Sequence, residues 1–280
     1  MDTAIHRSPQ DWLQRKQPTL RGVDLIHAHF VKHQFERHWH ESFSVGVTRS
    51  GVQSFRAAGS VHHSTQRKII CFNPGVAHDG QAGSADGFGY SMVYIDTDVV
   101  ARWATEAGLP PGGIYIRQPL ISDDATAPKL TAAFKSTGQP GESLRAYALL
   151  SSAVVQLLCR HGGRVQHDAI IDRAPVWIGQ VREYLHAHFA DDVTVEQLSA
   201  VANVSRVHLT RTFTEAQGIP PHAYLNTLRI NAAKDLMRHS NIALADVALE
   251  VGYADQSHFC RRFKGSASTT PSLWRDALKN

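Results

Sequence analysis

Two patterns of hydrophobic and polar positions divide the chain. Between residues 25 and 97, short alternating runs such as SFSVGVT place Phe43, Val45 and Val47 on one side, which is typical of strands. Short strands separated by Gly-rich turns favour a sandwich or a small barrel. From Trp177 onward the apolar spacing is helical throughout. The sequence therefore predicts an α+β protein with a strand-rich N-terminal domain and an all-α C-terminal domain.

Helical segments and a polar stretch separate these two parts. Residues 98–108 and 126–160 have helical spacing and are expected to flank the barrel. The stretch HGGRVQHDAIIDRAP is polar and contains glycines, so it is predicted to be a linker. The predicted parts are residues 1–160, the linker 161–175, and residues 176–280.

A repeat with a period of 50 residues runs through the C-terminal part. VSRVHLTRTF (204–213) is answered by ADQSHFCRRF (254–263). The matching pairs are His208 with His258, Leu209 with Phe259, Arg211 with Arg261, Phe213 with Phe263, Val201 with Val251, Ala202 with Gly252, Pro221 with Pro271 and Tyr224 with Trp274. Self-similarity of this kind indicates duplicated structural units.

Each copy has the layout of a helix-turn-helix unit, at about 194–217 and about 243–265. A short helix leads into a turn that contains Asn203 in the first copy and Gly252 in the second. Both residue types tolerate a positive φ. Residues 221–239 are predicted to form the helix that joins the units, with Leu225, Leu228, Ala232, Ala233 and Leu236 as its core stripe.

The second helix of each unit is predicted to expose one face. Ser205 and Asp255 are good N-caps for these helices. An exposed arginine can donate two hydrogen bonds to guanine, and glutamine can pair similarly with adenine. A single arginine of this kind is more often a solvated surface residue. The repetition of Arg211 and Arg261 in register with the turn and the core favours base contacts instead.

The patterns LSAVANVSRVHLTRTF and DVALEVGYADQSHFCRRFK resemble the C-terminal DNA-binding domain of the AraC family of bacterial transcription regulators. The resemblance covers about residues 177–278 and implies that the second helix of each unit reads DNA bases. Val207 departs from the pattern by offering only an apolar contact, and a thiol at Cys260 hydrogen-bonds more weakly than a hydroxyl. The implied DNA-binding set is Ser205, Arg206, Val207, Thr210, Arg211, Asp255, Gln256, Ser257, Cys260 and Arg261.

The resemblance also implies partners. Double-stranded DNA, a small-molecule effector and RNA polymerase are expected, together with a possible homodimer. Leu150, Val154 and Leu157 form one stripe of a helix that either makes the dimer contact or covers the barrel as a core helix. Arg229 on the joining helix either contacts phosphate or has a surface role.

Histidines gather in the strand-rich part. FERHWHESFSVGVTRSG places His38 and His40 two residues apart, on one face of a strand, and NPGVAHDG adds His78. These segments resemble the cupin-like jelly-roll sensor domain common at the N-terminus of AraC-family regulators. Metal-binding cupins carry a carboxylate three or four residues after the second histidine, where this chain has Ser44 and Val45.

Three interpretations of His38, His40 and His78 therefore stay open: a polar effector pocket, a metal site, and structural histidines at a barrel mouth. We expect the effector pocket, with no metal ion and no other cofactor. Three imidazoles with an acid would suit Zn, Fe or Mn, but the missing acid counts against a metal.

Composition adds little to this picture. The net charge is +4, and residues 177–280 hold 11 basic and 10 acidic side chains, so DNA binding has to rest on where the basic residues point. The three cysteines lie far apart, which fits a reducing cytosol. A signal peptide or a membrane span is not evident, so a cytoplasmic location is expected.

The leading hypothesis is a sequence-specific DNA-binding regulator, not an enzyme, whose barrel senses a small molecule. A metal-dependent cupin enzyme with an accessory helical domain is the main alternative. A helical adaptor that binds protein through its repeat is the third.

Overall fold

The computed structural model describes residues 4–7, 11–16, 21–109, 115–163 and 174–276. It divides into two compact units, one drawn from residues 1–34 and 39–166 and the other from residues 35–38 and 167–276. The strand at 35–38 is hydrogen-bonded into a sheet, and we describe it with that sheet. Most of the predicted linker, residues 164–173, lies outside the described residues.

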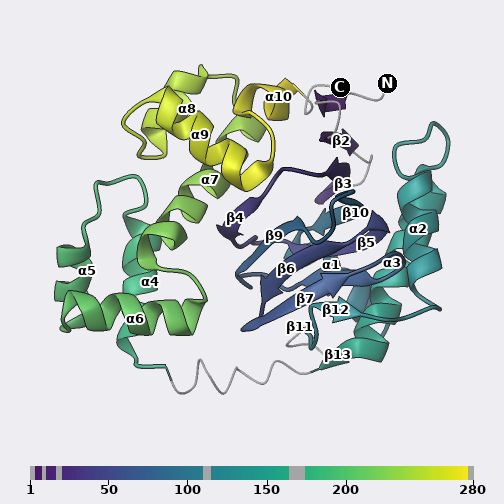
Figure 1. Cartoon of the computed structure of the whole chain (residues 1–280), viewed down its shortest axis with the longest axis horizontal. Coiled ribbons are helices and arrows are strands. Elements are labelled where there is room, and N and C mark those ends of the chain that lie inside the picture. Colours follow the sequence, from purple (N-terminus) through teal and green to yellow (C-terminus); the bar gives the residue numbers. More distant parts are fainter. Residues whose placement is uncertain (1–3, 8–10, 17–20, 110–114, 164–173, 277–280) are drawn as a thin grey trace. The chain divides into compact units, whose positions relative to one another are not determined.

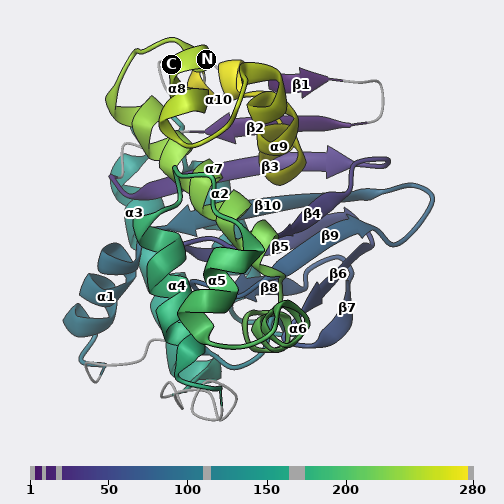
Figure 2. The ribbon, with the colours of Figure 1, turned by 90° about the vertical axis from the view of Figure 1, so that its left-hand side faces the viewer.

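The first unit is built on antiparallel strands. A seven-stranded sheet has the order β1-β2-β3-β10-β5-β8-β12, and a four-stranded sheet has the order β4-β9-β6-β7. Figure 2 shows β1, β2, β3 and β10 side by side. The strands are β1 (Ala4–Arg7), β2 (Trp12–Lys16), β3 (Val23–Phe30), β4 (Phe35–His38), β5 (Phe43–Gly51), β6 (Gln53–Ala57), β7 (Ser60–Ser64), β8 (Ile69–Phe72), β9 (His78–Ala82), β10 (Phe88–Ile95), β11 (Tyr115–Ile116), β12 (Leu120–Ile121) and β13 (Gly162–Gly163).

Three helices cover one face of the seven-stranded sheet. They are α1 (Thr97–Glu106), α2 (Ala127–Ser136) and α3 (Ser143–His161), and α2 and α3 run beside the sheet in Figure 1. The sequence predicted one helical region over 126–160, but the structure contains two helices. Gly138 and Gly141 lie in the connection between α2 and α3, and both have a positive φ, so one continuous helix cannot run through them.

The predicted alternation of β5 is confirmed. Phe43, Val45 and Val47 belong to one buried cluster with the helices, so they point to the helix-covered face. Leu150 and Val154 of α3 are 1% and 0% exposed in the same cluster. The α3 stripe therefore covers the sheet as a core helix and does not form a free face for a dimer contact.

The second unit is helical. Its helices α5 and α6 lie toward one end of α7, and α8 and α9 lie toward the other (Figure 1). The helices are α4 (Trp177–Ala187), α5 (Val195–Ala202), α6 (Arg206–Gln217), α7 (Pro221–His239), α8 (Leu244–Glu250), α9 (Gln256–Ala267) and α10 (Pro271–Asp276). The joining helix α7 has the predicted bounds.

The sequence repeat is a repeat of packing. Leu209 and Phe213 of α6 are fully buried, and so are Phe259 and Phe263 of α9. Behind each of these helices a further helix begins with a proline and supplies an aromatic ring. Tyr224 lies edge-on to Phe213 at 5.5 Å and 90°, and Trp274 lies edge-on to Phe263 at 6.0 Å and 75°. Aromatic rings prefer this tilted geometry.

The core of α7 is wider than the predicted stripe. Leu225, Leu228 and Ala233 are buried, but Ala232 and Leu236 are only partly buried. Other α7 side chains that were not predicted are buried, namely Tyr224, Thr227, Ile230 and Met237. The reason is that α7 contacts α4, α6, α8 and α9, so more than one face of this helix is covered.

The two turns use different residues for the same bend. Asn203 ends α5 with φ 52°, and Gly252 follows α8 with φ 84°. These positions differ by one residue from the 50-residue offset, so the turns are not identical. A Cβ on Gly252 would lie 2.5 Å from the carbonyl oxygen of Ala190, which leaves no room for a side chain.

We predict that Gly252→Ala destabilises the helical unit. The φ of 84° alone costs a residue with a Cβ about 1–3 kcal/mol, and the contact with the Ala190 carbonyl adds to this cost. Gly179→Ala is the matched control, because a Cβ there meets nothing within 4 Å and alanine favours the helix. Denaturant unfolding of the full chain, followed by circular dichroism, should show a loss for the first variant and no loss for the second. Equal stabilities would contradict the packing described here.

Candidate functional site

Helix α6 is set up by caps at both ends. Ser205 is its N-cap and accepts a hydrogen bond from the backbone N–H of His208 at 3.4 Å. Gly218 closes the helix with φ 73°. The preceding helix α5 begins with a capping box, in which Thr194 and Gln197 satisfy each other's backbone N–H groups. Local sequence therefore fixes where α6 starts and how far it extends.

The side of α6 away from its buried pair is exposed. Val207 is 80% exposed, Thr210 is exposed, and the Arg211 side chain is 67% exposed. At this exposure Val207 is not part of the core. Arg206 donates to Glu196 of α5 at 2.7 Å, and this bond lowers the pKa of the Glu196 carboxyl. The first turn of α6 thus carries an exposed arginine that pairs with an acid on the neighbouring helix.

Helix α9 repeats this arrangement. Asp255 is its N-cap and accepts a hydrogen bond from the His258 backbone N–H at 2.7 Å, which lowers the pKa of the Asp255 carboxyl. Gln256, Ser257 and Arg261 are exposed.

Cys260 differs from its neighbours on α9. Its side chain is only partly exposed, and burial raises the pKa of its thiol. A thiol with a raised pKa stays protonated at neutral pH, so this cysteine is a poor nucleophile. The raised pKa of the thiol counts against a redox role for Cys260.

Arg229 ties the helical unit together. Its guanidinium donates to the carbonyl oxygens of Phe189 at 2.7 Å and Asp191 at 2.8 Å. It also lies over the ring of Tyr253 at 5.6 Å, and the Tyr253 hydroxyl donates to Asn226 at 2.7 Å. The two expected roles, a phosphate contact and a surface position, did not include these internal contacts. Arg229 joins α7 to the loop after α4 and to the turn before α9.

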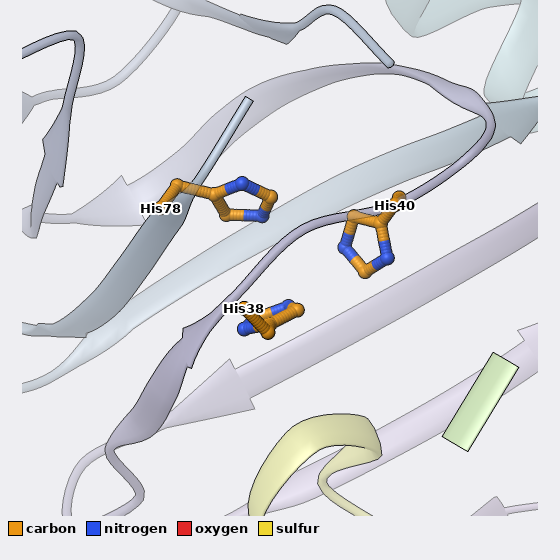
Figure 3. A group of neighbouring side chains, drawn as sticks. All are labelled: His38, His40 and His78. Atoms are coloured by element: carbon orange, nitrogen blue, oxygen red, sulfur yellow. The ribbon is translucent and has the colours of Figure 1, made fainter. Parts of the chain in front are cut away.

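The three predicted histidines meet in the sheet unit. Figure 3 shows His38, His40 and His78 with their rings gathered around one point, and one ring nitrogen of each lies within 4.8 Å of the others. His38 Nδ1 lies 2.6 Å from the Glu36 carbonyl oxygen, and His78 Nδ1 lies 2.9 Å from the Val76 carbonyl oxygen. A carbonyl oxygen only accepts, so Nδ1 is the protonated nitrogen in both rings.

A row of side chains on the seven-stranded sheet lies beneath this cluster. Asp24, Tyr94, Ser44 and Phe72 are successive cross-strand partners in β3, β10, β5 and β8. The His40 ring lies 5.0 Å from the Tyr94 ring, and the His78 ring stacks on Phe72 at 3.7 Å. Ser44 therefore sits between the two aromatic residues that support the two imidazoles.

Acidic groups are kept apart from the histidines. Within the described part of the chain, the group of His38, His40 and His78 includes no carboxylate. Asp24, in the row beneath, pairs with Arg15 at 2.6 Å. Ser44 and Val45 occupy the positions where metal-binding cupins carry a carboxylate. Ser44 lies on the side of the histidines, and Val45 faces the helices.

Sequence reasoning missed Tyr94 and Ser44 as neighbours of the histidines, and Glu196 as the partner of Arg206. The alternation of β5 and β10 could have placed Tyr94 and Ser44 on the inner face. Their register, which brings them opposite each other, depends on tertiary pairing.

Comparison with known proteins supports both units. Residues 21–158 match the family of AraC-like ligand binding domains, and residues 198–277 match a helix-turn-helix domain family. The chain is 24% identical over 228 residues to YbfI of Bacillus subtilis, an HTH-type transcriptional regulator, covering 81% of this chain and 82% of YbfI.

One further relative matches over a shorter stretch, and one solved structure matches over nearly the whole chain. AdaA of Bacillus subtilis, a bifunctional transcriptional activator and DNA repair enzyme, is 32% identical over 103 residues, which is 37% of this chain and 49% of AdaA. In fold, the chain is similar to an apo variant of ToxT of Vibrio cholerae, with a TM-score of 0.55 and 12% identity over 98% of this chain and 99% of ToxT.

These matches define a two-domain transcription regulator with an N-terminal ligand-binding domain and a C-terminal helix-turn-helix DNA-binding domain. The chain belongs to the AraC family of transcription regulators. Among the described residues, no helix is long and apolar enough to cross a membrane.

The cap of α9 leads to a prediction about pH. The pKa of Asp255 is lower in the folded chain than its ordinary value, so its capping contribution is complete above the ordinary pKa and is lost as pH falls from there through the lower folded-state pKa. Asparagine caps helices well but does not titrate. The stability of the parent relative to Asp255→Asn should therefore fall below about pH 4. Thermal unfolding of both proteins between pH 3 and pH 7 measures this difference, and parallel curves would argue against the cap.

Proposed function

We propose that this regulator reads a bipartite DNA site through the exposed faces of α6 and α9, and that a ligand in the sheet unit shifts the population of DNA-competent states. One observation carries the proposal. Two helices with the same buried pair, the same capping position and an arginine at the same outward position recur 50 residues apart. A common role in contacting DNA explains why α6 and α9 each carry an arginine on the exposed face.

The residue roles follow from side-chain chemistry. Arg211 and Arg261 suit guanine, Gln256 suits adenine, and Val207 suits the methyl group of thymine. Thr210, Ser257 and Cys260 are small side chains that lie beside these on the same surfaces. Ser205 and Asp255 cap the N-termini of α6 and α9. Arg206, which pairs with Glu196, is placed to contact the DNA backbone or a base at the edge of the site.

The spacing of the units suits two neighbouring major-groove segments. Helix α7 has 19 residues and is about 28 Å long at 1.5 Å per residue. Successive major-groove faces on one side of B-DNA are about 34 Å apart. With the width of each unit added, both helices can reach the DNA, and we expect the site to be bent.

The sheet unit supplies regulation. We assign residues 1–160 to effector binding and dimerisation, residues 161–175 to the linker and residues 176–280 to DNA binding. His38, His40 and His78 form the proposed effector site. An effector shifts DNA binding only if its affinity differs between the two states of the protein.

The finer partner assignments follow from this role. We propose that the chain acts without catalysis, in the cytoplasm, and that it contacts RNA polymerase. We also propose that it forms a homodimer through a surface other than the buried α3 stripe. The absence of catalysis is supported by relatives that are named as transcriptional regulators, although AdaA combines regulation with DNA repair.

We predict that Arg211→Ala and Arg261→Ala each weaken binding to the cognate site by about 1–3 kcal/mol and relax base preference at one position. The matched control is Arg145→Ala, because Arg145 is also an exposed helix arginine paired with an acid close by in the sequence. Fluorescence anisotropy with the cognate duplex and with single-base variants measures both effects.

Salt separates this proposal from the protein-adaptor alternative, because counterion release makes DNA binding fall steeply with salt. If both arginine variants bind cognate DNA as tightly as the parent, with unchanged base preferences, the assignment of the two faces is wrong.

A further inference from the structure

The sequence led us to expect no metal ion at the three histidines, but their grouping in the structure points the other way. We propose that His38, His40 and His78 hold one divalent transition-metal ion such as zinc, and that its remaining coordination position takes a carboxylate group of the effector. This inference rests on the proposed placement of the effector site at these histidines. It does not depend on which bases α6 and α9 read.

The backbone fixes the rings in the tautomer that binds metals. Nδ1 of His38 donates to the Glu36 carbonyl oxygen, and Nδ1 of His78 donates to the Val76 carbonyl oxygen. Each bond places the lone pair of the neutral ring on Nε2. Metal-binding histidines in proteins are oriented in this way, by a carbonyl or carboxylate on the other nitrogen. The two contacts therefore orient donor nitrogens toward a common point.

The cluster is compact enough for one ion. The three ring nitrogens lie within 4.8 Å of one another, whereas two nitrogens about 2.0 Å from a tetrahedral zinc ion lie about 3.3 Å apart. Small ring rotations close this difference. His38 and His78 are each 5% exposed, so their donor nitrogens belong to a buried site.

The lack of an acid determines what else the ion binds. Within the described residues, the ligand group consists of three neutral imidazoles, and Asp24 on the sheet below is already paired with Arg15. A divalent ion with only neutral ligands keeps its full charge in a buried place, which is unfavourable unless an anion joins it. An effector with a carboxylate supplies that anion at the position that three protein ligands leave open.

Ser44 marks a place for that oxygen ligand. It lies in the row between Tyr94 and Phe72, the residues under the His40 and His78 rings. Ser44 is 0% exposed, and its Oγ has no hydrogen-bond partner among the described residues. Buried hydroxyls are normally hydrogen-bonded, so this one is suited to donate to an oxygen atom bound in the cluster.

The first experiment measures metal binding to the full chain, without a histidine tag and after treatment with a chelator. Calorimetry with Zn(II) should show one tight site per chain. His40→Ala and His78→Ala should weaken it by at least about 100-fold, more than the loss of an outer-shell partner costs. The matched control is His63→Ala, because His63 is an exposed histidine of β7. No tight site, or one that all three substitutions leave unchanged, would overturn the proposal.

A second measurement on the unaltered chain covers the case in which a variant fails to fold. Cu(II) added to the protein should give an electron paramagnetic resonance spectrum with splitting from several nitrogens, whereas an oxygen-only spectrum would count against the site. Co(II) in the same protein should change its visible absorption when acetate is added, and Ser44→Ala should reduce the acetate effect while keeping Zn(II) binding. A Co(II) spectrum that ignores acetate would reject the open position.

DNA binding is measured in the same preparations, with and without Zn(II). If the chain binds DNA specifically but shows no metal site, this inference alone is rejected. If the chain has the metal site but does not bind DNA specifically, the proposed function of the helical unit alone is rejected.

Discussion

The buried pair on each of α6 and α9 is the constraint on which the proposed DNA-reading surface depends. Leu209 with Phe213, and Phe259 with Phe263, are fully buried and four residues apart, so they fix the rotation of α6 and α9 about their axes. Full burial of one such side chain contributes about 1.5–3 kcal/mol. With the inward face held this firmly, Arg211 and Arg261 are necessarily outward. The exposed chemistry is a consequence of the core.

The remainder of the helical unit keeps the two faces in a fixed relation. Helix α7 packs against helices of both halves, and Arg229 bonds to the loop after α4 while it covers Tyr253. The contacts of Arg229 are made to backbone carbonyls and to a buried aromatic ring, so we expect substitutions of Arg229 to change the spacing of the two units. In a bipartite DNA site, the spacing of the two protein units sets the distance between the half-sites.

The sequence predicted most of this unit because its signals are local and repeated. The caps at Ser205 and Asp255, the prolines at the starts of α7 and α10 and the i, i+4 pairs all depend on residues a few positions apart. The role of Arg229 was not predictable, since its partners lie about 40 residues away. In the sheet unit, the motifs HWH and NPG..H identified the three histidines as a candidate site. The row of Tyr94, Ser44 and Phe72 beneath them depends on strand register, and the alternation within each strand does not define that register.

The most direct test of the two-faced account is selection of bound sequences from a random DNA pool by the full chain, with and without Zn(II). The account predicts an enriched motif with two conserved blocks whose centres are about one helical turn apart, roughly 10–10.5 base pairs. Guanines should recur in both blocks, because an arginine faces outward on each helix. A motif with a single block, or no enrichment over the starting pool, would contradict the claim that α6 and α9 read DNA together.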